Sequence, residues 1–104
     1  SWTNIIIEIE NEDGKIEKHP YEIGPDILYQ LSQQIDNKEL NKFGTIIKTA
    51  RLKAGLTQEQ LAMRSGTTRF YISRIENNKT DIEMSTFRKI IEAGLGKHLR
   101  LIIE

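Results

Sequence analysis

The segment "LTQEQLAMRSGTTRFYISRIE" at residues 56–76 carries the clearest folding signals in this chain of 104 residues. Thr57 is suited to cap a helix, and Gln60 three residues later completes a capping box. Gly66 supplies the left-handed residue that ends such a helix, and the threonine pair after it caps a second helix that runs to about Glu76. The segment therefore predicts two short helices joined by a turn that contains glycine.

The second of these helices divides into two faces when its residues are placed 100° apart. One face is apolar and would pack against neighbouring helices. The opposite face carries cationic, aromatic and amide side chains, namely Arg69, Phe70, Ser73, Arg74 and Asn77. Such side chains can bond base edges or contact the thymine methyl group, and the second helix of a helix-turn-helix lies in the major groove of DNA. An ordinary surface helix also has a polar outer face, so this pattern alone leaves both interpretations open.

The flanking sequence predicts further elements on both sides of this pair. Apolar residues recur at helical spacing over 42–54 and again over 84–95. Alternation over 99–103 predicts a strand. At the other end, residues 1–23 predict a β-hairpin that turns at Asp13–Gly14, with Pro20 ending its second strand or placing it at a sheet edge. Residues 25–35 predict a short helix.

The net charge of zero hides a segregation of charge along the chain. Residues 1–40 hold nine acidic residues and three lysines, a net charge of −6, whereas residues 41–104 hold twelve basic and six acidic residues, a net charge of +6. This distribution predicts either two different partners or an acidic arm that masks a basic body. The absence of cysteine fits a reducing compartment, and no apolar run is long enough to span a bilayer, so we expect a cytoplasmic protein without a membrane partner.

Residues 42–95 resemble the helix-turn-helix family of phage lambda-type repressors, also called the XRE or Cro/C1 family. The resemblance is carried by T-Q-E-x-L-A, a glycine, and then Y-I-S-R-I-E-N at the family spacing. It implies a mainly α, lambda-repressor-like bundle over 41–96, with an N-terminal β-hairpin extension within 1–40 and a C-terminal strand at 97–104. Asn78 stands where the family usually has glycine, but asparagine tolerates left-handed geometry.

The resemblance also implies roles for individual residues. The implied base contacts are Thr68, Arg69, Phe70 and Arg74. The implied phosphate contacts are Gln58, Thr67, Tyr71, Asn78 and Lys79. Arg51 and Glu76 occupy the positions of a buried ion pair that commonly ties the first helix of the family domain to the end of the recognition helix. The alternative is that both are solvated surface charges.

The terminal "HLRLIIE" replaces the fifth helix of phage repressors and resembles HipB- and HigA-type antitoxins, in which such a strand pairs with its two-fold mate. Pairing between two chains would protect an exposed edge and would predict a homodimer on a palindromic double-stranded operator. Pairing within the chain, against the N-terminal hairpin, is the alternative.

The acidic residues of 1–40 have two possible roles. They either cover a basic toxin, of the RelE/HigB or HipA type, or act only as a solubilising hairpin.

Three hypotheses about function follow from the sequence. The first is an antitoxin of a type II toxin-antitoxin module that represses its own operon. The second is a stand-alone prophage or host regulator, and the third is a protein-interaction adaptor with a vestigial helix-turn-helix. His19 and His98 are too isolated to indicate a metal site, and no catalytic constellation is recognisable, so we expect neither enzyme activity nor a cofactor.

Overall fold

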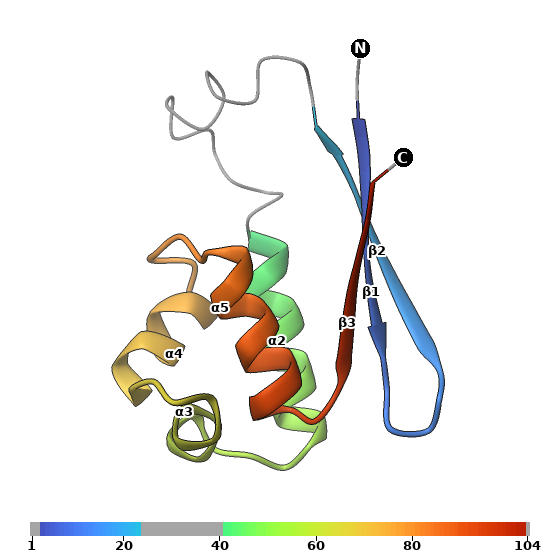
Figure 1. The fold of residues 1–104 in the computed structure, drawn as a ribbon. Coiled ribbons are helices and arrows are strands. Elements are labelled where there is room, and N and C mark those ends of the chain that lie inside the picture. The colour runs from blue at the N-terminus through green and yellow to red at the C-terminus, as the bar shows by residue number, and fades with distance from the viewer. Residues whose placement is uncertain (1–2, 24–40, 104) are drawn as a thin grey trace.

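The computed structural model describes residues 3–23 and 41–103, which form a helical bundle beside a three-stranded sheet (Figure 1). The helix expected over 25–35 lies outside the described residues. In chain order the elements are β1 (Thr3–Glu10), β2 (Ile16–Ile23), α2 (Asn41–Lys53), α3 (Gln58–Ser65), α4 (Arg69–Glu76), α5 (Met84–Lys89), the π-helical turn η1 (Ile90–Gly94) and β3 (His98–Ile103). The mainly α fold with a hairpin and a terminal strand is as the sequence predicts.

Helices α3 and α4 begin and end where their capping signals predict. Thr57 accepts a hydrogen bond from the Gln60 backbone N–H at 3.0 Å, and the Gln60 side chain accepts one from the Thr57 N–H at 2.9 Å, which completes the capping box. Gly66 ends α3 with a φ of 70°, a conformation that costs glycine little. Thr68, and not Thr67, caps α4 by accepting a hydrogen bond from the Tyr71 N–H at 3.1 Å.

The helix expected over 84–95 changes its winding partway along its length. Residues after Lys89 form a π-helical turn, in which the Leu95 N–H donates to the Ile90 carbonyl oxygen at 3.0 Å. Gly94 lies in this turn against α3, and a Cβ atom there would stand only 2.8 Å from a Leu61 methyl carbon. The wider turn therefore belongs to the close packing of η1 on α3, a contact that helical periodicity does not encode.

The hairpin of β1 and β2 has the antiparallel pairing and the turn that the sequence predicts. Gly14 adopts a φ of 84°, and its N–H donates to the Asn11 carbonyl oxygen at 2.9 Å. The strand order is β2-β1-β3, so β2 is an edge strand. Pro20 can therefore lie within β2, because an edge strand tolerates the loss of one backbone donor.

The terminal strand β3 pairs with β1 of its own chain. Leu99 lies opposite Ile9, Leu101 opposite Ile7 and Ile103 opposite Ile5 in an antiparallel register. Of the two pairings that the sequence left open, the structure shows the one within the chain, and β1 satisfies one edge of β3. Since β1 is central in the sheet, the hairpin and the terminal strand cannot be separated without breaking this ladder.

One hydrophobic core connects the sheet to the helices. Ile7 and Ile9 of β1 and Leu99 of β3 are buried together with Ile47 of α2 and Phe87 of α5. The Phe87 ring meets the Phe43 ring edge to face, with ring centroids 4.9 Å apart. Residues 3–23 are therefore an integral part of the folded unit, although their charge suggested a separate arm.

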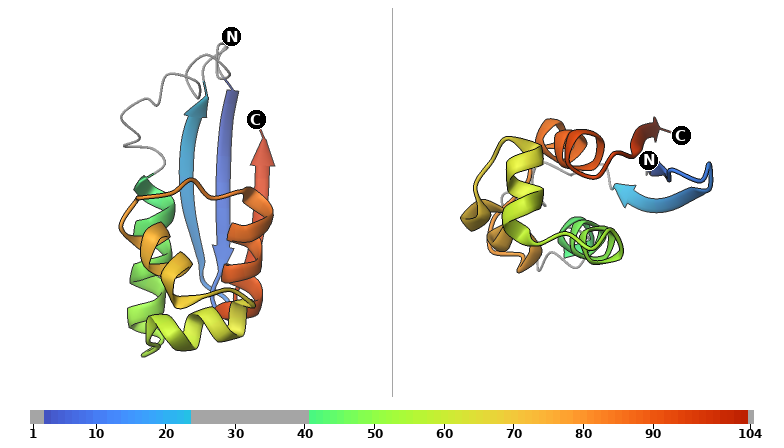
Figure 2. Two further views of the ribbon diagram at one scale, coloured as in Figure 1. Left: turned by 90° about the vertical axis from the view of Figure 1, so that its left-hand side faces the viewer. Right: turned by 90° about the horizontal axis from the view of Figure 1, so that it is seen from below.

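The sheet and the two helices of the predicted DNA-reading unit lie on opposite sides of the molecule. Figure 1 shows the sheet on one side, α3 and α4 on the other, and α2 with α5 between them. The side view in Figure 2 has α3 and α4 in front and the sheet behind. The described part of the hairpin therefore does not mask α4. No helix within 3–23 and 41–103 has the length and hydropathy needed to cross a membrane.

Candidate nucleic-acid interface

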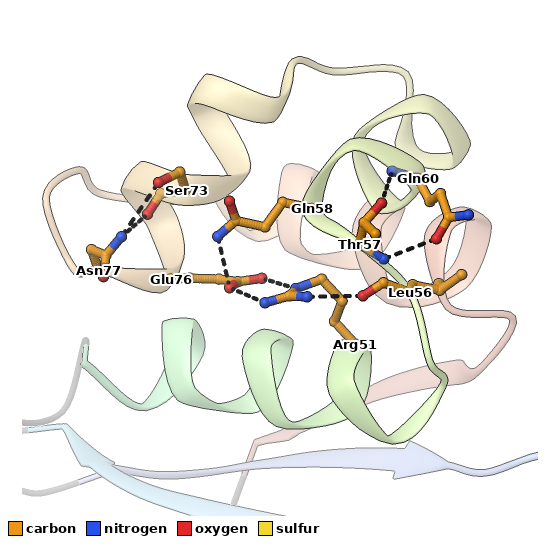
Figure 3. A network of polar contacts seen from close by, with 8 residues as sticks. All are labelled: Arg51, Leu56, Thr57, Gln58, Gln60, Ser73, Glu76 and Asn77. Atoms are coloured by element: carbon orange, nitrogen blue, oxygen red, sulfur yellow. Dashed lines mark hydrogen bonds and ion pairs between the residues drawn. The ribbon is translucent and has the colours of Figure 1, made fainter.

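A buried ion pair fixes the end of α4 against α2. The Arg51 Nε donates to Glu76 Oε2 at 2.7 Å, and Arg51 Nη2 donates to Glu76 Oε1 at 2.9 Å (Figure 3). Arg51 is 8% exposed and Glu76 7%, so the pair lies in the interior and not among solvated surface charges. Hydrogen bonding to Glu76 raises the pKa of Arg51, although burial opposes this shift.

The ion pair also reaches the start of α3. Arg51 Nη1 donates to the Leu56 carbonyl oxygen at 2.8 Å, and Gln58 Nε2 donates to Glu76 Oε1 at 3.2 Å (Figure 3). Side chains of α2 and α3 therefore meet at one carboxylate of α4. Because Arg51 donates through all three of its guanidinium nitrogens, the cluster sets the orientation of α4 relative to α2 and α3.

The outer face of α4 presents the residues expected to contact bases. Thr68 and Arg69 are exposed at the start of the helix, and Phe70 is 71% exposed beside them. An aromatic ring this exposed is available to a partner. The inner face buries Ile72 and Ile75, as the two-face division predicts.

Arg74 is half-buried on the same outer face, and two contacts within the chain hold its side chain. Its guanidinium carbon lies 5.6 Å from the centroid of the Phe70 ring, and its Nη2 donates to the Lys79 carbonyl oxygen at 2.7 Å. Because a guanidinium carries five N–H donors, most of them stay free for a bidentate contact. Holding the side chain in place lowers the entropy that such a contact would cost.

The residues expected to contact phosphate border this face at both ends of α4. Thr67 and Tyr71 are half-buried at its N-terminal end, and Tyr71 also packs on the core. Asn78 and Lys79 are exposed beyond the C-terminal end, and Asn78 adopts the left-handed conformation with a φ of 57°. Gln58 differs from the rest, because its amide donates to Glu76 and therefore belongs to the buried ion-pair cluster.

Gly44 is a positioning residue that the helical pattern of α2 did not reveal. A Cβ atom there would stand 2.4 Å from the Ile75 carbonyl oxygen and 2.7 Å from Asn78 Oδ1. Only glycine lets α2 approach the last turn of α4 so closely. A glycine within an otherwise helical pattern costs about 1 kcal/mol relative to alanine, and that cost is the signal by which the sequence could have identified the position.

Comparisons with known proteins agree with this geometry. Residues 47–94 match the helix-turn-helix family HTH_3. A protein from Haemophilus influenzae strain Rd, described as an uncharacterized HTH-type transcriptional regulator, is 35% identical over 80 residues, which are 70% of this chain and 81% of that protein.

Among solved structures, the wild-type restriction-modification controller protein C.Esp1396I is similar, with 38% identity and a TM-score of 0.55 over 59% of this chain and 79% of that one. The same controller, as a tetramer in complex with its natural 35 base-pair operator, matches with 38% identity and a TM-score of 0.54 over 58% of this chain and 78% of that one. From the relative, the matched family and the fold, this chain belongs to the XRE-like helix-turn-helix family of DNA-binding transcriptional regulators.

Proposed function

We propose that this protein is a sequence-specific repressor that reads an operator through α4. The observation that carries the proposal is the exposed face of Arg69, Phe70 and Arg74, held in one orientation by the buried Arg51–Glu76 pair. Thr68 is the fourth proposed base contact. The C.Esp1396I controller binds its operator as a tetramer, which supports an operator role for a chain with the same fold.

The test begins with selection of preferred sites from a randomised duplex library, followed by affinity measurements on single-base variants of the selected site. Arg69→Ala or Arg74→Ala should each cost about 1–3 kcal/mol and relax the preference at one base pair. Lys79→Ala should weaken binding to all sequences similarly, because a phosphate carries no base information. Lys15→Ala, at the remote and exposed hairpin turn, is the control for loss of one positive charge. Unchanged preferences in both arginine variants would rule out this reading face.

The proposed repressor acts as a homodimer through the free edge of β3. At Leu99 the backbone groups on that edge are bonded by two side chains. Arg88 Nη1 donates to the Leu99 carbonyl oxygen at 3.0 Å, and the Leu99 N–H donates to Glu92 Oε2 at 3.2 Å. Backbone groups two residues apart point the same way, so Leu101 and Ile103 offer their groups to the same edge. Among the described residues these groups have no partner, and the Ile103 side chain is 68% exposed. A second β3 would satisfy them and predicts a palindromic site.

Leu101→Pro tests the dimer directly. It removes a backbone donor that faces the open edge and leaves the ladder to β1 in place, so the variant should fold but remain monomeric in sedimentation. Ile16→Ala, at an exposed site on the opposite edge strand, is the control. This variant should sediment with the same oligomeric state as the native protein. A native protein that is monomeric at all concentrations would contradict the dimer.

A toxin partner is the second part of the proposal, and charge is the observation that favours it. The described hairpin, residues 3–23, carries six acidic residues against two lysines, on the side of the molecule away from α4 (Figure 1). A small basic protein of the RelE/HigB or HipA type could bind there and leave the DNA-reading face open. The stand-alone regulator and the adaptor with a vestigial helix-turn-helix are the competing functions.

Charge reversal separates these functions better than deletion, since deleting the hairpin would remove core residues. Glu12→Lys with Asp13→Lys, both at the exposed hairpin turn, should abolish co-purification of a basic partner without changing DNA affinity. Native protein that binds its operator but captures no partner would favour the stand-alone regulator. Weak binding that is independent of sequence and salt would favour the adaptor.

A further inference from the structure

A pocket of about 310 Å³ lies where the turn between α3 and α4 meets α5. Its lining includes Ser65, Gly66 and Thr67 from the turn, Tyr71 from α4, and Lys89 from α5. Water occupies about 30 Å³ per molecule in the liquid, so a pocket of this size can hold a compact polar group. The helices therefore build a recess with both polar and apolar walls beside the first turn of α4.

Two polar groups of this recess have no protein partner. The Lys89 ammonium takes part in no hydrogen bond or ion pair within the described chain, yet it lies over the turn, 3.1 Å from where a Cβ on Gly66 would stand. Ser65 is only 2% exposed, and its hydroxyl has no hydrogen-bond partner among the described residues. The Ser65 hydroxyl faces η1, because it is the atom nearest to where a Cβ on Gly94 would stand, so Lys89 is the group of the lining that is free to bind a ligand.

The chemistry of the lining selects an anion. Lys89 provides three donors and a positive charge, and Thr67, Tyr71 and Thr86 add hydroxyl groups. No carboxylate of the described residues lines the pocket. The N-terminal turn of α4 adds a partial positive charge from its backbone N–H groups. A tetrahedral oxyanion with several acceptor oxygens, such as a phosphate, fits this set of donors.

The position of the pocket relative to the reading face indicates where the phosphate comes from. Helix α4 has 8 residues, which makes it about 12 Å long at a rise of about 1.5 Å per residue. The major groove is also about 12 Å wide. When the residues at the start of α4 contact base edges, the recess beside that end lies near one phosphate wall of the groove, while Asn78 and Lys79 lie at the other end of the helix.

We propose that this pocket receives a phosphate of the DNA backbone and that Lys89, from outside the helix-turn-helix, is its cationic ligand. The inference rests on the proposed operator binding and adds to it a contact that the resemblance did not imply. The pocket would fix the insertion of α4 in the groove without reading sequence, since a phosphate contact positions the protein and does not specify a base.

Salt dependence of DNA binding provides the first test. Each neutralised phosphate contributes about 0.9 to the slope of log affinity against log salt. Lys89→Gln should reduce the slope by about that amount for each bound protomer, on every sequence. Its affinity deficit relative to the native protein should then narrow about 3.5-fold per bound protomer between 50 and 200 mM salt. Lys15→Gln, which removes the same charge at the remote hairpin turn, is the matched control and should leave the slope unchanged.

A titration with inorganic phosphate provides a second test that needs no DNA. Binding is monitored through the NMR chemical shifts of the Thr67 and Tyr71 amides. The native protein should show saturable shifts that Lys89→Gln abolishes. Ser65→Ala is the matched control within the lining: it should keep or raise the melting temperature, because it removes an unpaired buried group, and should leave phosphate binding unchanged, because the hydroxyl faces η1. Melting curves of each variant confirm that the fold is retained.

The outcomes separate this inference from the proposed function. If phosphate shifts the amides but Lys89→Gln keeps the native salt slope, the pocket binds free phosphate and the assignment to DNA is overturned. If Lys89→Gln matches Lys15→Gln in both assays while Arg69→Ala still alters sequence preference, the pocket is not an anion site and the proposed function stands. If the native protein binds no duplex at any salt concentration, the proposed function and the DNA assignment fail together.

Discussion

Removal of the Arg51 side chain tests the structural basis of the DNA-reading unit most directly. Arg51 donates to Glu76 through two nitrogens and to the Leu56 carbonyl oxygen through a third, and both charged residues are more than nine-tenths buried. Arg51→Ala would leave the Glu76 carboxylate in the interior with the Gln58 amide as its remaining donor. Breaking a buried pair in this way costs about 3–5 kcal/mol of the free energy of unfolding.

Urea denaturation followed by circular dichroism measures this loss. With an m-value of about 1–3 kcal/mol/M, the Arg51→Ala midpoint should fall by at least about 1 M. Arg64→Ala is the matched control, because Arg64 is exposed on α3 and its loss should change stability by no more than about 0.5 kcal/mol.

A double variant separates the stranded charge from the loss of packing. Arg51→Met with Glu76→Leu replaces the pair by apolar side chains and should recover most of the lost stability, because no uncompensated charge stays buried. The reasoning would be refuted if Arg51→Ala unfolded at the same urea concentration as Arg64→Ala. It would also fail if the double variant were as unstable as the single one.

Three further predictions concern the rest of the fold. Gly44→Ala should destabilise by about 1–3 kcal/mol in thermal unfolding, because the new Cβ would meet the Ile75 carbonyl oxygen at 2.4 Å; a stabilised variant, as expected for alanine in an open helix, would contradict the close approach. Ile9→Ala should cost about 2–5 kcal/mol in urea unfolding, whereas Ile16→Ala at an exposed site should cost little, and equal losses would show that the hairpin is not part of the core. Thr57→Ala should cost about 1 kcal/mol and increase amide exchange at the start of α3, and unchanged exchange there would mean that the capping box is dispensable.

The parts of the fold that the sequence predicted well have local causes. The capping box at Thr57, the left-handed glycine at Gly66 and the cap of α4 each act over three or four residues, so their signals can be read from a short window. The outer face of α4 follows from helical periodicity alone. The roles of its residues and the Arg51–Glu76 pair came from the resemblance, since periodicity assigns neither a partner nor a ligand.

The sequence could not determine contacts between distant segments. Two pairings of β3 were open, because an alternating strand identifies its faces but not its neighbour, and the structure places β3 on β1 of the same chain. The charge of residues 1–40 suggested an arm over the basic body, yet burial of Ile7 and Ile9 fixes the described hairpin on the side away from α4. The close approach of α2 to the last turn of α4 at Gly44 likewise depends on the packing of the two helices.

Local signals in the amino-acid sequence predict the helices of the reading unit, the hairpin, the terminal strand and the side chains that α4 exposes, because capping, turn chemistry and periodicity act over a few residues. Packing of the whole chain sets which strand β3 joins, how Arg51 and Gln58 meet at the buried Glu76 carboxylate, and the place of Lys89 over the turn before α4. These features depend on the packing of segments that lie tens of residues apart, and such packing is settled by the shared core and not by any one segment.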